Sequence, residues 1–185
     1  MIRAILIFSI EIVTRMSEVE VIQRLVDFDR SSFDAFLLGL RRLGWEEVTR
    51  NREIGHRSIK NTMVHILNVH EALLVRIAQR KGRVSQSIWR KHEKVRSMAD
   101  LRKYRAQVWK EIDPFVKSLT TGQLHQRVKI PWFPGRYDLS DVFFQASFEQ
   151  AHHLGEIIAA YWQMDTAPSQ MMWIPTLLEL NVGVD

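Results

Sequence analysis

The amino-acid sequence predicts an all-α fold, a four-helix bundle with a short hairpin-like excursion between the third and fourth helices. Apolar residues recur at spacings of three and four in four long segments, which is the pattern of helices that bury one face. The sequence has no internal repeat and no strong strand alternation. With 185 residues, 46% of them hydrophobic, the chain is long enough for one domain with a substantial core.

The first two helices are predicted from serine caps and apolar periodicity. Ser17 and Glu20 have the spacing of a capping box, so the first helix should begin after Ser17, and Gly44 ends its pattern. A polar stretch over residues 46–57 leads to Ser58, a plausible N-cap for the second helix, and Gly82 lies just past its end. The second helix therefore contains both His65 and His70.

The second half of the chain is predicted to hold the third helix, the excursion and the fourth helix. Residues 83–96 are weakly periodic and predict a loop with a short turn around Trp89, after which Ser97 caps the third helix. Pro114 should kink that helix or divide it. Alternating residues and a Pro-Trp-Phe-Pro-Gly turn over 127–139 predict a short hairpin, and the last helix should run from near Ser140 to about Met164.

The two ends of the chain differ from this pattern. Residues 1–15 hold an apolar run interrupted by Glu11, without a cleavage site and too short to span a bilayer, so we expect an N-terminal extension upstream of a start at Met16. Residues 16–185 are then one helical bundle domain of a cytoplasmic protein without a membrane partner. The apolar tail over 169–185 should dock on the bundle or on a partner subunit.

Composition narrows the chemistry. The chain has no cysteine, so a metal ion must be held by His, Asp or Glu. The formal net charge is +5, but the cationic residues are scattered and acidic residues fall between several of them. A solvated helix surface explains such a pattern, and a nucleic-acid partner is therefore not expected; the weaker alternative is nucleic-acid binding through residues 76–96.

Glu149 and His153 form the most informative local pair. They lie four residues apart on the predicted fourth helix, which places them about 40° apart around its axis, so both can reach one inward point. His152 lies about 100° from His153 and should not face the same point. His65 and His70 differ by about 140° on the second helix, and their spacing alone leaves them as alternatives for a third ligand. The loop histidines His56, His92 and His125 are assigned no function.

Three segments of the sequence resemble the DinB/YfiT superfamily. They are residues 58–67 of the second helix, residues 149–157 of the fourth, and Tyr161-Trp162-Gln163-Met164 with the following Pro168. The resemblance covers nearly all of the chain from residue 17 onward. It implies a four-helix bundle, often dimeric, with one metal ligand on the second helix and two, spaced i and i+4, on the last. By position these ligands fall on His65, Glu149 and His153.

The resemblance also implies a function. Characterised relatives include metal-dependent transferases that move a low-molecular-weight thiol onto an electrophile, and hydrolases and isomerases that use thiol cofactors. We therefore expect a homodimeric metal-dependent enzyme with a small-molecule substrate and a Zn, Ni, Fe or Mn ion; the alternative is a non-catalytic metal-binding or dimerising bundle that acts as a protein-interaction module. The sequence departs from the family pattern at Glu149, where a histidine is usual, and at Gln145, where a further histidine is frequent.

Two other residues of the fourth helix bear on the site and on packing. Glu156, three residues beyond His153, has the spacing to orient that ligand, but the pattern favours a solvent-exposed carboxylate, so Glu156 is assigned no role. Gly155, with Ala151 and Ala159 on either side, makes a smooth strip where another helix backbone can approach closely.

Overall fold

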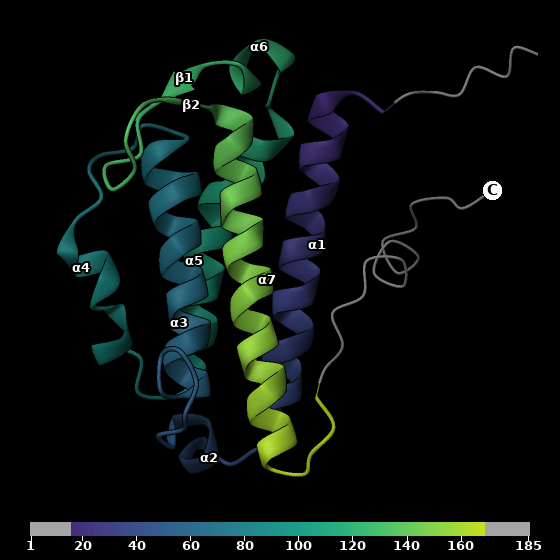
Figure 1. Ribbon diagram of the computed structural model, residues 1–185, viewed down its shortest axis with the longest axis vertical. Coiled ribbons are helices and arrows are strands. Elements are labelled where there is room, and N and C mark those ends of the chain that lie inside the picture. Colours follow the sequence, from purple (N-terminus) through teal and green to yellow (C-terminus); the bar gives the residue numbers. More distant parts are fainter. Residues whose placement is uncertain (1–15, 169–185) are drawn as a thin grey trace, which may run out of the picture.

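Four long helices run side by side through the molecule (Figure 1). The computed structural model describes residues 16–168. The long helices are α1 (Glu18–Gly39), α3 (Ile59–His70), α5 (Met98–Lys117) and α7 (Leu139–Gln163), and α3 continues as the π-helix η2 (Glu71–Ile77). Because α7 packs against both α1 and α3, and α5 packs against the same two helices, the four form a closed bundle. The predicted all-α bundle is confirmed.

The helices begin where side-chain caps satisfy their first backbone N–H groups. Ser17, Ser58 and Ser97 precede α1, α3 and α5, and their side chains accept hydrogen bonds from the backbone N–H groups three residues on. Asp138 precedes α7, and its backbone N–H donates to Asp141 Oδ2 at 3.0 Å. Each predicted serine cap is confirmed, and α7 begins one residue before the predicted Ser140.

The prediction that Pro114 divides the third helix is wrong. Helix α5 continues through Pro114 to Lys117. Proline lacks a backbone N–H group, so the carbonyl of Lys110 loses its helical donor, but the turn that follows still forms, with the backbone N–H of Ser118 donating to the carbonyl of Pro114 at 3.2 Å. Phe115 and Val116, which follow it, pack on the core and hold this last turn in place.

Short elements connect the long helices. The 3₁₀ segment η1 (Leu40–Arg42) extends α1, and α2 (Trp45–Thr49) lies in the stretch predicted to be irregular. Helix α4 (Gln86–Trp89) with η3 (Lys91–Glu93) forms the predicted turn around Trp89, and α6 (Thr121–Leu124) follows α5. Strands β1 (Arg127–Val128) and β2 (Tyr137–Asp138) pair antiparallel, with Arg127 opposite Asp138, which confirms the predicted excursion.

The core is continuous through the bundle. Its largest fully buried side chains include Phe33 and Phe36 of α1, Trp109 of α5 and Phe143 of α7. Among residues 16–168, no helix is both long and apolar enough to cross a membrane. The predictions for the N-terminal extension and for the apolar tail fall on residues 1–15 and 169–185, outside the described part.

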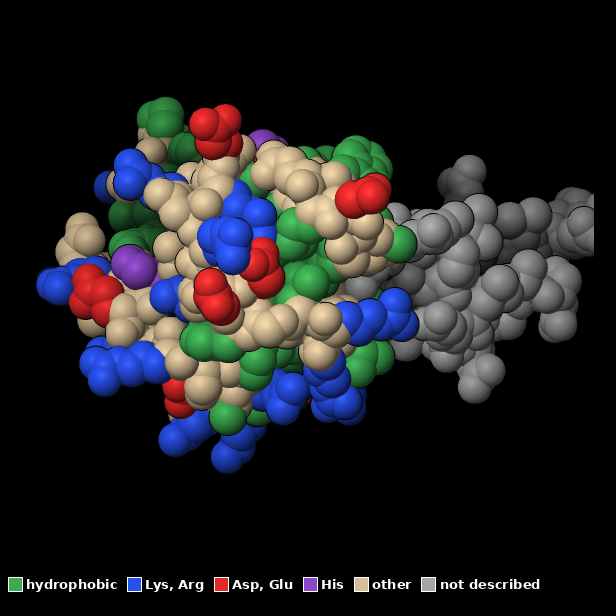
Figure 2. All heavy atoms as spheres, turned by 90° about the horizontal axis from the view of Figure 1, so that it is seen from below, with side chains coloured by type: hydrophobic (Ala, Val, Ile, Leu, Met, Phe, Trp, Pro, Cys, Tyr) green, Lys and Arg blue, Asp and Glu red, His purple; other side chains and the backbone are tan. Residues whose placement is uncertain are grey.

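Cationic side chains are spread over the surface. Figure 2 shows Lys and Arg side chains around one end of the bundle, with Asp and Glu side chains among them. Ion pairs recur at separate places along the chain: Arg50 with Glu47 at 2.5 Å, Lys81 with Glu111 at 2.6 Å, and Arg90 with Glu93 at 2.8 Å. Exposed pairs of this kind contribute little to stability and are typical of a solvated, mixed-charge surface.

Candidate metal centre

Three histidines from three parts of the chain meet at one side of the bundle. His65 lies in α3, His153 in α7, and His56 in the loop that precedes α3. One ligating nitrogen from each lies within 4.8 Å of the other two. The His56 and His65 rings stack at 3.9 Å between centroids, and the His65 and His153 rings lie 4.6 Å apart. This arrangement can hold a metal ion.

The loop that supplies His56 is fixed at both ends. The backbone N–H of Arg52 donates to the carbonyl of Arg57 at 2.5 Å, and Arg57 adopts a left-handed conformation with φ 66°. Gly55 faces α7 so closely that a Cβ atom there would lie 2.8 Å from Cδ of Glu156. A residue without a side chain is therefore needed beside His56 if Glu156 is to keep its position.

Carboxylates on α7 orient His153. Nδ1 of His153 lies 2.9 Å from Oε2 of Glu156, and Nε2 lies 3.5 Å from Oε2 of Glu149. When Nδ1 donates its proton to Glu156, Nε2 carries the free lone pair that a metal requires. Glu149 is itself held by Gln145, whose Nε2 donates to Oε1 at 2.9 Å. The one-turn spacings on α7 thus place His153 between two carboxylates.

The structure separates the histidines that spacing alone left as alternatives. His65 joins the cluster, whereas His70 is fully buried beside Trp109, with neither ring nitrogen hydrogen-bonded. His153 is buried and belongs to the cluster, whereas the side chain of His152 is 67% exposed and its Nε2 lies 3.4 Å from Glu156. Of the predicted set, His65 and His153 lie in the cluster, whereas Glu149 contacts His153 at 3.5 Å but is not one of the three clustered residues. The role of His65, Glu149 and His153 as metal ligands stays a prediction.

The sequence reading missed His56. It assigned no function to this residue because helical periodicity says nothing about where a loop side chain points. One local signal was available: His56 lies two residues before Ser58, the cap that fixes the start of α3, and directly after a glycine. The sequence also favoured a solvent-exposed Glu156, but its side chain is only 22% exposed and its carboxylate lies at hydrogen-bond distance from the His153 ring.

The protonation of the cluster is compatible with metal binding. Burial, together with the neighbouring His56 and His153, lowers the pKa of His65 to about 3. Burial and His153 also lower the pKa of His56. Both rings are therefore neutral near pH 7, the state in which an imidazole coordinates a metal ion.

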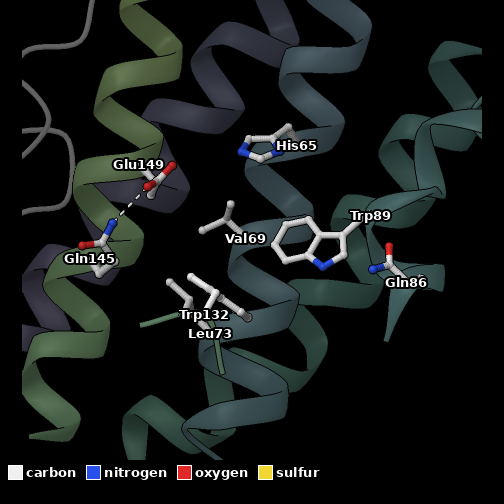
Figure 3. Close-up of a pocket in the computed structure, with 8 residues that line it drawn as sticks. All are labelled: His65, Val69, Leu73, Gln86, Trp89, Trp132, Gln145 and Glu149. Atoms are coloured by element: carbon white, nitrogen blue, oxygen red, sulfur yellow. Dashed lines mark hydrogen bonds between the residues drawn. The ribbon is translucent and has the colours of Figure 1, made fainter. Parts of the chain in front are cut away.

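A cavity of about 450 Å³ opens beside the cluster (Figure 3). His65, Val69 and Leu73 line it along α3 and η2, and Gln145 and Glu149 lie across from them on α7. The remaining lining residues are Gln86, Trp89 and Trp132. The two indole rings meet edge to face at 5.8 Å, and Trp89 lies 6.0 Å from His65. The wall is largely apolar, and its lining residues in the described part of the chain include no Lys or Arg.

A second polar group lies on another face of α7, toward α1. Asp29 of α1 is buried, and its Oδ1 accepts a hydrogen bond from Ser147 Oγ at 2.8 Å. Gln150 Nε2 donates to the backbone carbonyl of Asp29 at 2.7 Å. Burial raises the pKa of Asp29 to about 7, although the bond from Ser147 opposes that shift. This group joins α1 to α7 within the core.

Comparison with known proteins supports the fold and the family. No curated protein matches the chain. A family model described as the DinB superfamily matches residues 28–157, a range that begins within α1, ends within α7 and includes all three clustered histidines. Because the match covers more than half of the chain, this four-helix bundle with its histidine cluster belongs to the DinB superfamily.

Proposed function

We propose that the chain is a metal-dependent enzyme whose divalent ion is held by His56, His65 and His153. The observation that carries the proposal is the convergence of three imidazole nitrogens within 4.8 Å at the edge of a cavity. A tetrahedral ion with metal–nitrogen bonds of about 2.0–2.1 Å holds its nitrogens roughly 3.3 Å apart. We expect the three nitrogens, which lie within 4.8 Å of one another, to draw together to that spacing when an ion binds.

The donor set fits a borderline first-row ion. Three neutral imidazoles with a carboxylate nearby suit Zn, Ni, Fe or Mn, and three protein ligands leave room for a substrate. Glu156 supplies the outer carboxylate that commonly fixes the tautomer of a ligating histidine, at 2.9 Å from Nδ1 of His153. When bound, such an ion acts as a Lewis acid that lowers the pKa of a coordinating thiol or water.

We assign Glu149 the task of accepting a proton. Its carboxylate lies between the cluster and the cavity, 3.5 Å from Nε2 of His153, and its side chain is 34% exposed. Gln145 holds one oxygen and leaves the other free toward His153. The sequence-based assignment of Glu149 as a ligand stays a competing prediction, and a Glu149→Gln variant separates the two. If the variant keeps its metal and loses activity, Glu149 is the proton acceptor. If the variant loses its metal, Glu149 is a metal ligand.

The cavity favours an apolar substrate body. Trp89, Trp132 and the aliphatic wall offer apolar contact, and no cation lines the space to hold a carboxylate or phosphate. The reaction we propose is transfer of a low-molecular-weight thiol onto an electrophile seated in this cavity. Sulfur forms a bond to the electrophilic carbon, the leaving group departs with its electron pair, and Glu149 accepts the thiol proton.

Metal analysis tests the site directly. Protein purified without a histidine tag should contain close to one equivalent of a divalent ion. His56→Ala, His65→Ala and His153→Ala should each lose most of it, whereas His125→Ala, a substitution of the same kind outside the cluster, should retain it. Sub-stoichiometric metal that is the same in all five proteins would overturn the metal site.

Activity is tested on the metal-loaded protein with a chromogenic aryl halide and a panel of small thiols. Thioether formation above the uncatalysed rate, lost in the His65→Ala and Glu149→Gln variants, supports the transferase. Full metal occupancy without turnover of any thiol would support the metal site but would reject thiol transfer as its reaction.

A second candidate function, self-association through α7, is favoured by one surface. Phe144, Phe148 and Trp162 are 41%, 70% and 69% exposed, and they lie near Gly155 on the same helix. Among the described residues, nothing lies within 4 Å of a Cβ built at Gly155. The close helix approach predicted at this glycine is therefore not made within residues 16–168, and we propose that α7 of a second copy makes it.

Light scattering on the full chain tests the dimer. Wild-type protein should have twice the monomer mass, and Phe148→Glu should shift it toward monomer because an exposed charge replaces an apolar contact. Leu38→Glu, at an exposed apolar residue of α1, is the matched control and should leave the mass unchanged. A monomeric wild type would reject this interface.

A further inference from the structure

A second large cavity lies away from the histidine cluster, between the end of η2 and the β1–β2 hairpin. Its volume is about 650 Å³. We call it the basic groove, because its lining within residues 16–168 includes six cationic residues and no acidic one. The six are Arg76, Arg80, Arg83, Arg127, Lys129 and Arg136. Segments some fifty residues apart in the sequence thus combine their charges, which the scattered pattern of the sequence did not predict.

Most of these charges are not neutralised by the chain itself. Arg76 pairs with Glu71 at 2.8 Å, and Arg127 pairs with Asp138 at 3.0 Å. Within residues 16–168, the other four cations have no carboxylate within 4.0 Å. Like charges gathered around one cavity repel each other, and a bound anion removes that repulsion.

Backbone geometry brings the two sides of the groove together. Arg80 and Gly82 adopt positive φ values of 55° and 83°, which turn the chain back after η2 and place Arg83 on the groove. On the hairpin side, the Arg127 guanidinium donates to the backbone carbonyl of Arg136 and also pairs with Asp138. The groove is therefore built by two folded turns, not by one mobile arm.

The lining indicates the chemistry of the ligand. A guanidinium group can donate two parallel hydrogen bonds to the oxygens of one phosphate. Solvent and salt screen each exposed cation, so several cations together are needed to bind an anion firmly. Ile77, Val128 and Pro131 give the groove an apolar part. No aromatic residue lines it, so it lacks the stacking platform that binders of single-stranded nucleic acid use.

We propose that the basic groove binds a compact phosphate-bearing molecule with at least two negative charges. The phosphate oxygens contact the unpaired guanidinium groups, and the organic part rests on the apolar residues. This site is independent of the proposed metal centre, because none of its lining residues belongs to the cluster or to the cavity beside it.

Calorimetric titration of the full chain with inorganic pyrophosphate tests the proposal. Wild-type protein should bind it with an affinity that falls as salt rises. The double variant Arg83→Gln/Arg136→Gln should bind roughly tenfold or more weakly, because two charge-assisted contacts are lost. The control Arg102→Gln/Lys103→Gln removes the same net charge from exposed positions of α5 and should stay within about twofold of wild type.

Two further arms identify the ligand. His65→Ala should keep its pyrophosphate affinity, which excludes binding through an ion at the histidine cluster. A single-stranded oligonucleotide should bind more weakly than pyrophosphate. No pyrophosphate binding by wild type, or equal losses in the groove variant and the α5 control, would overturn the proposal. Oligonucleotide binding that depends on Arg83 and Arg136, without pyrophosphate binding, would also overturn it in favour of a nucleic-acid partner.

Discussion

Two faces of α7 bury polar groups in different ways. Toward α1, Ser147 and Gln150 donate hydrogen bonds to Asp29, so that group is paired within the chain and closed to solvent. Toward α3, His153 meets His56 and His65, whose nitrogens face one another beside a cavity. A buried polar group that finds donors in its own chain joins helices, whereas imidazoles that face one another suit an external ion.

The largest expected effect is a gain in the free energy of unfolding when zinc binds, and this gain should depend on the α3 face of α7 and not on the α1 face. Zinc at about a thousand times its dissociation constant should add about 4 kcal/mol to the free energy of unfolding of the wild type. His153→Ala should lose this increment. Ser147→Ala should keep it, although removal of the donor to Asp29 lowers the baseline by about 1 kcal/mol. Urea unfolding with and without zinc measures the zinc increment and the baseline stability of each variant. Equal zinc increments in the two variants would show that the two faces do not differ in metal binding.

The second expected effect concerns pH and the α1 face. Burial raises the pKa of Asp29 to about 7 from 3.8, so the folded state binds this proton more tightly than the unfolded state does. The stabilisation of the folded state by this proton is complete below the pKa that Asp29 has in the unfolded chain, and it is lost as pH rises through about 7. Asp29→Asn should therefore be more stable than wild type by roughly 2–4 kcal/mol at about pH 8 and close to it at about pH 4.

Urea unfolding of both proteins across this pH range provides the measurement. His70, whose pKa burial lowers to about 4, changes stability in the opposite direction, but it is present in both proteins and cancels in their difference. A difference that does not change with pH would show that Asp29 keeps an ordinary pKa.

The smallest of the three effects concerns Glu156, the carboxylate that contacts His153 of the histidine cluster. Glu156→Gln should weaken zinc affinity by about 10–100-fold, because an amide is a poorer acceptor for Nδ1–H of His153. His125→Ala is the control, since among the described residues His125 lies outside both groups that could hold an ion, whereas His152 belongs with His153 and Glu156 to the second of them. Competition with a chelating dye measures both affinities. Unchanged zinc affinity in Glu156→Gln would show that Glu156 does not support metal binding through His153.

Local chemistry explains how much the sequence predicted. Serine caps and apolar periodicity are properties of neighbouring residues, so the starts of α1, α3 and α5 followed from Ser17, Ser58 and Ser97. The division expected at Pro114 failed because Phe115 and Val116 pack on the core and hold the turn that follows, a tertiary contact that a local rule for proline does not include.

The candidate site was predicted only where helices supply it. Spacing on one helix placed Glu149 near His153, and family resemblance selected His65 over His70. Neither helical spacing nor the resemblance points to His56, because its position depends on a loop conformation and on contact between Gly55 and Glu156 across the fold. The basic groove was missed for the same reason, since it combines η2 with a distant hairpin.

The loop origin of His56 affects how quickly an ion would exchange. Two of the three histidines lie on long packed helices, whereas His56 is carried by a short connection between α2 and α3. Opening such a connection requires far less free energy than unfolding the bundle. The rate of metal release should therefore follow local opening of residues 51–57, and a chelator should remove the ion while the four helices remain folded.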